Sequence, residues 1–171
     1  MTRIARWTRW TASALAVLLM LIGTFGVAAA ENRGTTTPPP PTSYGELEQL
    51  YRLRKQQLRS LDEMLTRDER RAVEVEQLIA YAKGKGKDTA ALERALATYR
   101  ATLGSARAAW KIAFEVLKTH AGFNDAGHVT NPDQARATLK SAENALYKCY
   151  RMTHYAEELL ARALAEFRNQ K

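Results

Sequence analysis

The sequence predicts an all-α protein in which three long antiparallel helices form a bundle with left-handed, heptad-type packing. Apolar residues recur at three- and four-residue spacing through most of residues 44–171. The same region is rich in residues that favour helix, and it contains no alternating β-branched run with hairpin turns. Turn residues divide it into three segments of similar length, and short turns between such segments favour antiparallel packing. The predicted helices span about 44–83, 89–121 and 132–170.

The first predicted helix carries an apolar seam over five heptads. Its members are Leu47, Tyr51, Leu58, Leu61, Leu65, Ala72, Val75, Ile79 and Ala82, widened by Leu50, Met64 and Leu78. Only Arg54 and Asp68 interrupt it. Reflection of the chain about its turns places Arg54 near Glu115, and Asp68 near Thr102 and Thr153. The two charges indicate polar layers or seam edges, and a small polar ligand site inside the bundle is the alternative.

The second predicted helix follows a turn over residues 83–87, where glycines release the backbone and lysines suit a helix C-terminus. Asp88 or Thr89 is expected to cap it. Its seam consists of Leu92, Leu96, Tyr99, Leu103, Ala106, Trp110, Ala113, Leu117 and His120. Trp110 has the largest side chain on any seam. We therefore expect it at the centre of the core, level with Leu58, Leu61 and Leu146.

The third predicted helix has the clearest start in the chain. Gly122 is expected to end the preceding helix as its left-handed residue, with Phe123 folding back on the last turn. Asn131 is expected as the N-cap and Pro132 as the first helical residue, in a capping-box pattern with Gln134. The seam that follows carries no charge and consists of Ala135, Leu139, Ala142, Leu146, Cys149, Thr153, Ala156, Leu160, Ala163 and Phe167.

The N-terminal region has the pattern of an export signal. Residues 1–30 begin with three arginines, continue with an apolar stretch and end with Ala28–Ala30, small residues of the kind that a signal peptidase accepts. An uncleaved membrane anchor over residues 12–30 is the alternative. Residues 31–43 are rich in proline and threonine and predict an extended linker. We therefore expect the bundle outside the cytoplasm, either secreted, periplasmic or at the cell surface.

The charge of the expected mature domain is only mildly basic. The chain has 26 Lys and Arg against 18 Asp and Glu, a net charge of +8. Three of the arginines belong to the predicted signal, which leaves 23 against 18, or +5. This mixture of charges and the predicted export disfavour a nucleic-acid partner.

No catalytic, metal-binding or cofactor-binding motif is present. Cys149 is the only cysteine, so no internal disulfide can form. Its place on the apolar seam predicts a small buried side chain, and an intermolecular disulfide or a reactive thiol is the alternative. His154 with Glu157 and Glu158 supplies two metal ligands at most, and the chain has no Glu-x-x-His motif. We expect no metal, no cofactor and no enzymatic activity.

The candidate functional surface is a basic row on the third predicted helix. Five side chains follow one another at four- and three-residue spacing beside Tyr147: Arg136, Lys140, Asn144, Lys148 and Arg151. Such a row could hold an anionic polymer, a lipid surface or an acidic protein face, although Glu143 nearby would offset part of its charge.

The expected function is that of a non-enzymatic protein-interaction or scaffolding module of the cell envelope or extracellular space, with self-association as a further expectation. The basic row supports a binder of anionic polymer or membrane surface as the alternative. A chaperone-like holdase would additionally require a large exposed apolar patch.

Overall fold

The computed structural model describes residues 43–170, and all regular secondary structure within that range is helical. It consists of three α-helices, α1 (Tyr44–Gly84), α2 (Ala90–Thr119) and α3 (Pro132–Asn169). These bounds lie within two residues of the predicted ones, so the prediction of an all-α protein with three long helices is confirmed. The predicted signal or anchor, residues 1–30, lies outside the described residues. So does the predicted linker, except for Ser43.

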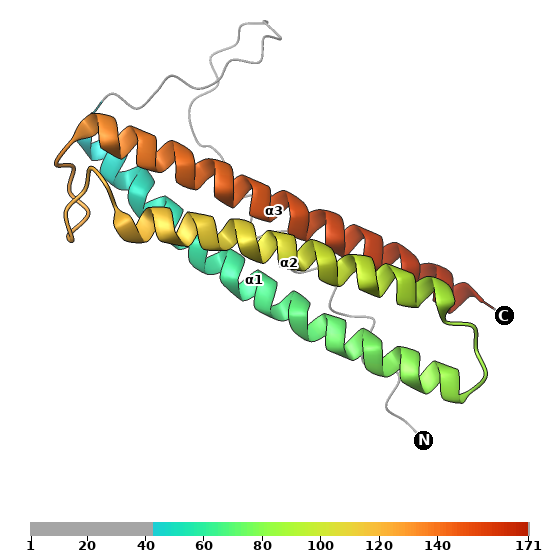
Figure 1. Ribbon diagram of the computed structural model, residues 1–171. Coiled ribbons are helices and arrows are strands. Elements are labelled where there is room, and N and C mark those ends of the chain that lie inside the picture. Colours follow the sequence, from blue (N-terminus) through green and yellow to red (C-terminus); the bar gives the residue numbers. More distant parts are fainter. Residues whose placement is uncertain (1–42, 171) are drawn as a thin grey trace, which may run out of the picture. The chain divides into compact units, whose positions relative to one another are not determined.

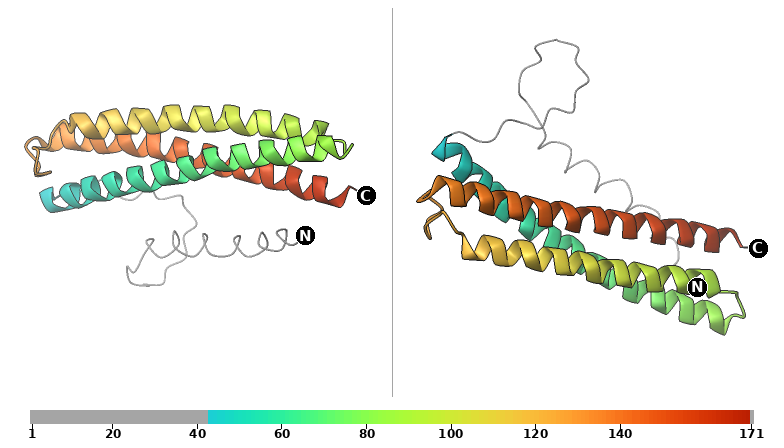
Figure 2. Two further views of the ribbon diagram at one scale, coloured as in Figure 1. Left: turned by 90° about the horizontal axis from the view of Figure 1, so that it is seen from below. Right: turned by 45° about the horizontal axis from the view of Figure 1, so that its top comes forward.

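The three helices form an antiparallel bundle, in which α1 and α3 run in one direction and α2 in the other (Figure 1). α2 and α3 share the most extensive interface and lie side by side, whereas α1 crosses this pair obliquely and contacts both (Figure 2). Buried alanines are frequent on α2 and α3, while α1 contributes mainly larger side chains. Smaller contact residues let helix axes approach more closely. None of the three described helices contains a stretch apolar enough to cross a membrane.

Side chains cap the starts of the helices. Ser43 accepts a hydrogen bond from the Glu46 amide at 3.3 Å, and the Ser43 amide donates to the Glu46 carboxylate at 3.1 Å, which completes a capping box at α1. Asp88 accepts from the Ala90 amide at 2.9 Å at the start of α2. Asn131 accepts from the amides of Asp133 and Gln134, both at 3.1 Å, which confirms it as the N-cap of α3.

The end of α2 differs from the prediction. The helix ends at Thr119, and the left-handed residue at its C-cap is His120, with φ of 41°, rather than Gly122. Gly122 instead lies against the start of α3, where a Cβ would come within 2.2 Å of the Ala135 nitrogen. Phe123 is buried, with its amide donating to the His120 carbonyl at the end of α2 at 2.9 Å and its ring stacked on Tyr51 of α1, centroids 4.3 Å apart. The glycine is therefore required by tertiary packing rather than by the helix end.

The core largely follows the predicted seams. Every apolar member of the α1 seam is buried, and so is Asp68. The described seam of α3 is buried from Ala135 to Leu160, and Cys149 is fully buried, as predicted for a small core side chain. Burial raises the pKa of the Cys149 thiol, which keeps it in the neutral form.

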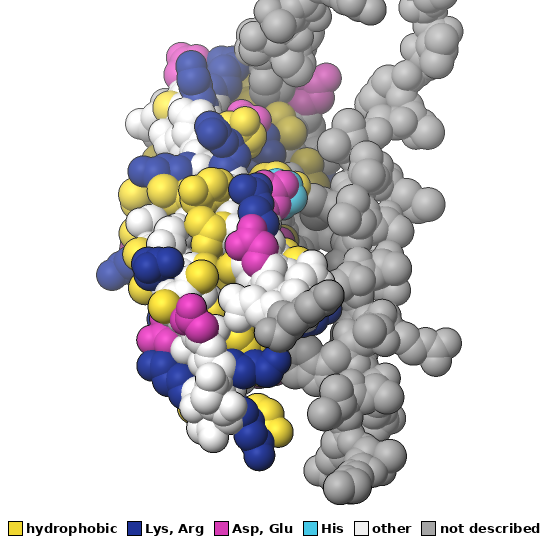
Figure 3. Space-filling view, turned by 90° about the vertical axis from the view of Figure 1, so that its right-hand side faces the viewer, with side chains coloured by type: hydrophobic (Ala, Val, Ile, Leu, Met, Phe, Trp, Pro, Cys, Tyr) yellow, Lys and Arg dark blue, Asp and Glu magenta, His cyan; other side chains and the backbone are white. Residues whose placement is uncertain are grey.

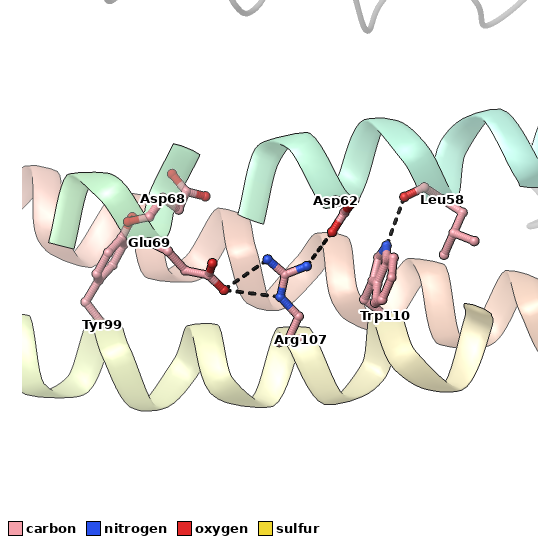
Figure 4. Close-up of polar contacts among 7 residues, drawn as sticks. All are labelled: Leu58, Asp62, Asp68, Glu69, Tyr99, Arg107 and Trp110. Carbon is pink, nitrogen blue, oxygen red and sulfur yellow. Dashed lines mark hydrogen bonds and ion pairs between the residues drawn. The ribbon is translucent and has the colours of Figure 1, made fainter. Parts of the chain in front are cut away.

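Trp110 departs from its predicted place. Ala109 is buried instead, and Trp110 packs at the edge of the core. Its indole N–H donates to the Leu58 carbonyl at 2.9 Å (Figure 4), and its ring stacks on Phe114. The residue is level with Leu58, as predicted, but the prediction that it fills the centre is wrong. A small side chain fits where α2 and α3 approach closely, and the largest fully buried side chain is Tyr99.

Arg54 contacts a different residue from the one predicted for it. Its guanidinium donates to Glu143 of α3 at 2.8 Å and to Gln57 at 2.8 Å, rather than meeting Glu115 of α2. Reflection about a turn gives the height of a side chain along the bundle, but not which of the two neighbouring helices it faces. The prediction of Arg54 as a charged seam edge fits its largely buried position, with 16% of the side chain exposed.

Asp68 forms a buried polar layer where the three helices meet. The Tyr99 hydroxyl donates to its backbone carbonyl at 3.2 Å, and Arg71 lies 3.7 Å from its carboxylate and 3.6 Å from Glu157 of α3. Tyr99 and Glu157 lie about one helical turn from the neighbours predicted for Asp68, which were Thr102 and Thr153. Burial, and secondly the nearby Glu157, raise the pKa of Asp68 to about 6.

A second polar contact joins α2 to α1. Arg107 donates to Glu69 at 3.0 and 3.1 Å and also to Asp62 (Figure 4). Because charged hydrogen bonds of this kind have defined geometry, they help to set the height of α2 against α1.

Candidate anion-binding groove

An open groove of about 610 Å³ lies between α2 and α3. α2 contributes one wall, formed by Thr98, Ala101, Thr102 and Ser105. α3 contributes the other, formed by Tyr147, Lys148, Arg151, Met152 and Tyr155. The volume falls within the usual range of ligand sites. Of the six residues predicted for the basic surface, Tyr147, Lys148 and Arg151 therefore lie in a groove, opposite a wall of hydroxyl groups.

The α3 wall presents two cations and two aromatic rings. No described residue forms an ion pair or hydrogen bond with the side chain of Lys148 or Arg151. The Arg151 guanidinium lies over the Tyr147 ring, 5.7 Å from its centroid, an arrangement that orients the cation and leaves its N–H donors unused. Tyr147 is 61% exposed and Tyr155 57% exposed. The α3 wall therefore offers hydrogen-bond donors, positive charge and aromatic surface.

The α2 wall presents hydroxyl groups whose hydrogens are already used. Thr98 donates to the Arg94 carbonyl at 3.1 Å, Thr102 to the Thr98 carbonyl at 2.9 Å, and Ser105 to the Ala101 carbonyl at 3.2 Å. Such bonds to the carbonyl four residues earlier are common for these residues in helices. A hydroxyl oxygen has two lone pairs, so each group can still accept a hydrogen bond. The α2 wall is therefore a row of acceptors.

No acidic side chain lines this groove. Glu143, which the sequence suggested as a partial offset to the basic row, instead binds Arg54 of α1 at 2.8 Å. Because Glu143 binds Arg54 and does not line the groove, it does not compensate the charge of Lys148 and Arg151 there. This combination of positive charge and missing acid is what an anionic ligand requires.

The other predicted members of the basic row lie outside the groove. Arg136 forms an ion pair with Asp133 at 2.8 Å, near the start of α3. Lys140 and Asn144 are exposed but lie outside the lining. Sequence reasoning missed Tyr155 and the whole α2 wall. The three- and four-residue spacing of the hydroxyls Thr98, Thr102 and Ser105 could have shown a polar stripe, but not which helix faces it.

A second hollow of about 490 Å³ lies between α1 and α2. It has mixed charge, because Asp62 and Asp125 line it together with cations. This hollow is therefore less suited to an anion than the groove between α2 and α3.

The remaining charge is spread over the surface. Seen from the end that carries the α1–α2 turn, basic side chains alternate with acidic and apolar ones (Figure 3). The histidines each lie near one carboxylate: His120 near Asp125, His128 near Glu48, and His154 near Glu158. No group of three potential metal ligands occurs within residues 43–170.

Comparison of the chain with family models, with curated proteins and with solved structures finds no match.

Proposed function

We propose that this protein is an exported, non-enzymatic binding module that holds an anionic partner in the groove between α2 and α3. The observation that carries the proposal is the lining of that groove, where Lys148 and Arg151 lie beside two exposed tyrosines without an acidic neighbour. Lys148 and Arg151, which form no ion pair with a described acid, attract an anion at long range, and exposed tyrosines add contact area at a small cost in conformational entropy.

Export is part of the same proposal. Residues 1–30 would direct the chain out of the cytoplasm. If this segment stays in the membrane as an anchor, residues 31–43 would hold the bundle away from the bilayer. We expect a mature N-terminus at Glu31, which intact-mass measurement of the exported protein would detect. Recovery of the full-length chain in the membrane fraction would instead favour an anchor over residues 12–30.

We also propose that the three helices wind around one another in the left-handed supercoil that the heptad spacing of their seams predicts.

A protein partner with an acidic face is compatible with this groove, and self-association through another face is a further alternative. A holdase is less well supported. The large exposed apolar side chains are distributed over all three helices, and most of them are tyrosines. A holdase requires a continuous apolar surface instead.

The test is binding of soluble polyanions to the purified protein, with Lys148→Glu as the diagnostic variant. We expect binding at low ionic strength that weakens as salt is added, because screening shortens the range of the charges. Lys148→Glu should weaken binding roughly tenfold or more, since it places an acid in the groove.

Arg70→Glu is the matched control. It changes the net charge by the same amount at an exposed position of α1 that has no ion pair with a described residue. We expect it to change affinity less than about twofold. The absence of polyanion binding at low salt, or equal losses in the two variants, would contradict the proposed function.

A further inference from the structure

The two walls of the groove differ in hydrogen-bonding character. Thr98, Thr102 and Ser105 on α2 use their hydroxyl hydrogens within the helix, so they offer oxygen lone pairs. Lys148 and Arg151 on α3 offer only N–H donors and positive charge. A ligand that carries anionic groups together with hydroxyl or amide donors can therefore bind both walls directly.

Carboxylate side chains of an acidic protein supply only one half of this combination. Ionised Asp and Glu accept hydrogen bonds but donate none. They could bind Lys148 and Arg151, but the acceptors of α2 would then be bound by water or by other groups of that protein. An anionic polysaccharide has both kinds of group on each repeating unit, because its acidic groups accept hydrogen bonds and its ring hydroxyls donate them.

The tyrosines favour sugar rings in the same groove. Tyr147 and Tyr155 are eight residues apart on α3, which corresponds to about 12 Å along the helix. Both tyrosines are more than half exposed, and because the Arg151 guanidinium lies over one face of the Tyr147 ring, a sugar would pack against the opposite face. The C–H face of a sugar ring is apolar and packs against an aromatic ring, while its hydroxyls remain free to bind polar groups at the rim. The separation of the tyrosines exceeds the length of one sugar ring, so the groove suits a chain of sugars.

From these features we infer that the groove between α2 and α3 binds an anionic polysaccharide, with sugar hydroxyls donating to Thr98 and Thr102 and acidic groups binding Lys148 and Arg151. This inference rests on the proposed function, since it names the chemical class of the anionic partner. It also assigns a role to the α2 wall, which a purely electrostatic surface would not use.

The experiment compares two polymers that both carry one carboxylate per unit. Polygalacturonate has ring hydroxyls, and poly-L-glutamate has none. We expect the protein to bind polygalacturonate about tenfold more tightly at matched length and ionic strength, as about two additional hydrogen bonds would give. Neutral dextran should bind much more weakly than polygalacturonate, because it lacks the charge.

The double variant Thr98→Val, Thr102→Val tests the α2 wall directly. Valine retains the branched shape and removes the acceptor oxygens. Affinity for polygalacturonate should fall roughly tenfold, and affinity for poly-L-glutamate should stay the same. Thr119→Val is the matched control, because Thr119 makes the same bond, to the Glu115 carbonyl at 2.9 Å, on the same helix but outside the groove. Circular dichroism of each variant should match that of the unaltered protein.

The possible results separate the two proposals. Equal affinity for the two polyanions, with no effect of the double variant, would overturn the polysaccharide assignment and leave an acidic protein as the partner. Failure of both polyanions to bind at low salt would overturn the proposed function itself. Preference for polygalacturonate that is lost in the double variant and retained in Thr119→Val would support both.

Discussion

Two glycines in the connection between α2 and α3 show how one conformation can have different causes. Gly122 and Gly127 have nearly the same positive φ, 85° and 83°. A Cβ on Gly122 would lie 2.2 Å from the Ala135 nitrogen and 2.6 Å from the Asn131 oxygen, both in the backbone. A Cβ on Gly127 would meet only the Tyr51 ring, at 3.4 Å. The backbone conformation is common to both positions, and only Gly122 also has a steric requirement.

This difference predicts unequal costs of the same substitution. Gly127→Ala should lower the free energy of unfolding by about 1–2 kcal/mol, the usual cost of a left-handed non-glycine residue. Gly122→Ala should cost about 2–5 kcal/mol, because the start of α3 must also shift. Denaturant titration of the two variants measures the difference. Equal losses of unfolding free energy in the two variants would mean that the backbone around residue 122 can move away from the start of α3 at little cost.

At the scale of the helices, two of the aromatic residues of α2, Tyr99 and Trp110, have different roles. Tyr99 is fully buried and donates to the Asp68 carbonyl of α1, whereas Trp110 lies at the edge of the core and donates to the Leu58 carbonyl. Both residues join α2 to α1 through a side-chain donor and a backbone acceptor. Their burial, and therefore their share of apolar stabilisation, differs.

We expect Tyr99→Ala to destabilise the bundle more than Trp110→Ala. The first substitution should cost about 3–5 kcal/mol, as for a fully buried aromatic side chain. The second should cost about 1–3 kcal/mol, because part of the indole is exposed to solvent and the space can fill with water. Chemical denaturation of both variants decides the order. A larger loss for Trp110→Ala would show that the edge between α1 and α2 dominates the stability of the bundle.

At the scale of the whole molecule, Asp68 links the stability of the bundle to pH. The groups around its carboxylate are Arg67 and Arg71 on α1, Tyr99 on α2 and Glu157 on α3. One carboxylate oxygen, Oδ2, has no hydrogen-bond partner among the described residues. Ionisation of this group is therefore unfavourable in the folded protein.

The pKa of Asp68 is raised from 3.8 to about 6, so the folded protein keeps this proton after the unfolded chain has lost it. Stability should therefore fall as pH rises from about 4 to about 6 and change little from this source above that range. Asp68→Asn should remove the effect and stabilise the protein at pH 7 by up to about 3 kcal/mol.

Denaturant titration at several pH values tests this prediction. The difference between Asp68→Asn and the unaltered protein should grow between pH 4 and pH 6. Glu63→Gln, at an exposed position of α1 without an ion pair to a described residue, serves as the control and should show no such growth. A constant difference at all pH values would mean that the Asp68 carboxylate reaches solvent or a donor.

The sequence by itself determined the all-α class, the three helices and nearly all of the core. Members of the α1 seam such as Leu47 and Ile79 are buried as predicted, and Asn131 caps α3. These features follow from local rules, because the helical repeat decides which residues share one face, and capping and turn residues act within a few positions of themselves. The export signal and the linker remain predictions.

Tertiary structure alone decided which faces meet. It placed Ala109 rather than Trp110 in the core, and it paired Arg54 with Glu143. The groove between α2 and α3 joins residues about fifty positions apart, of which only the α3 side carried a basic pattern in the sequence. Periodicity gives each helix its own buried face, but the rotation, height and neighbours of three helices depend on packing all of them at once. For that reason Lys148 could be predicted as a candidate, and its hydroxyl partners on α2 could not.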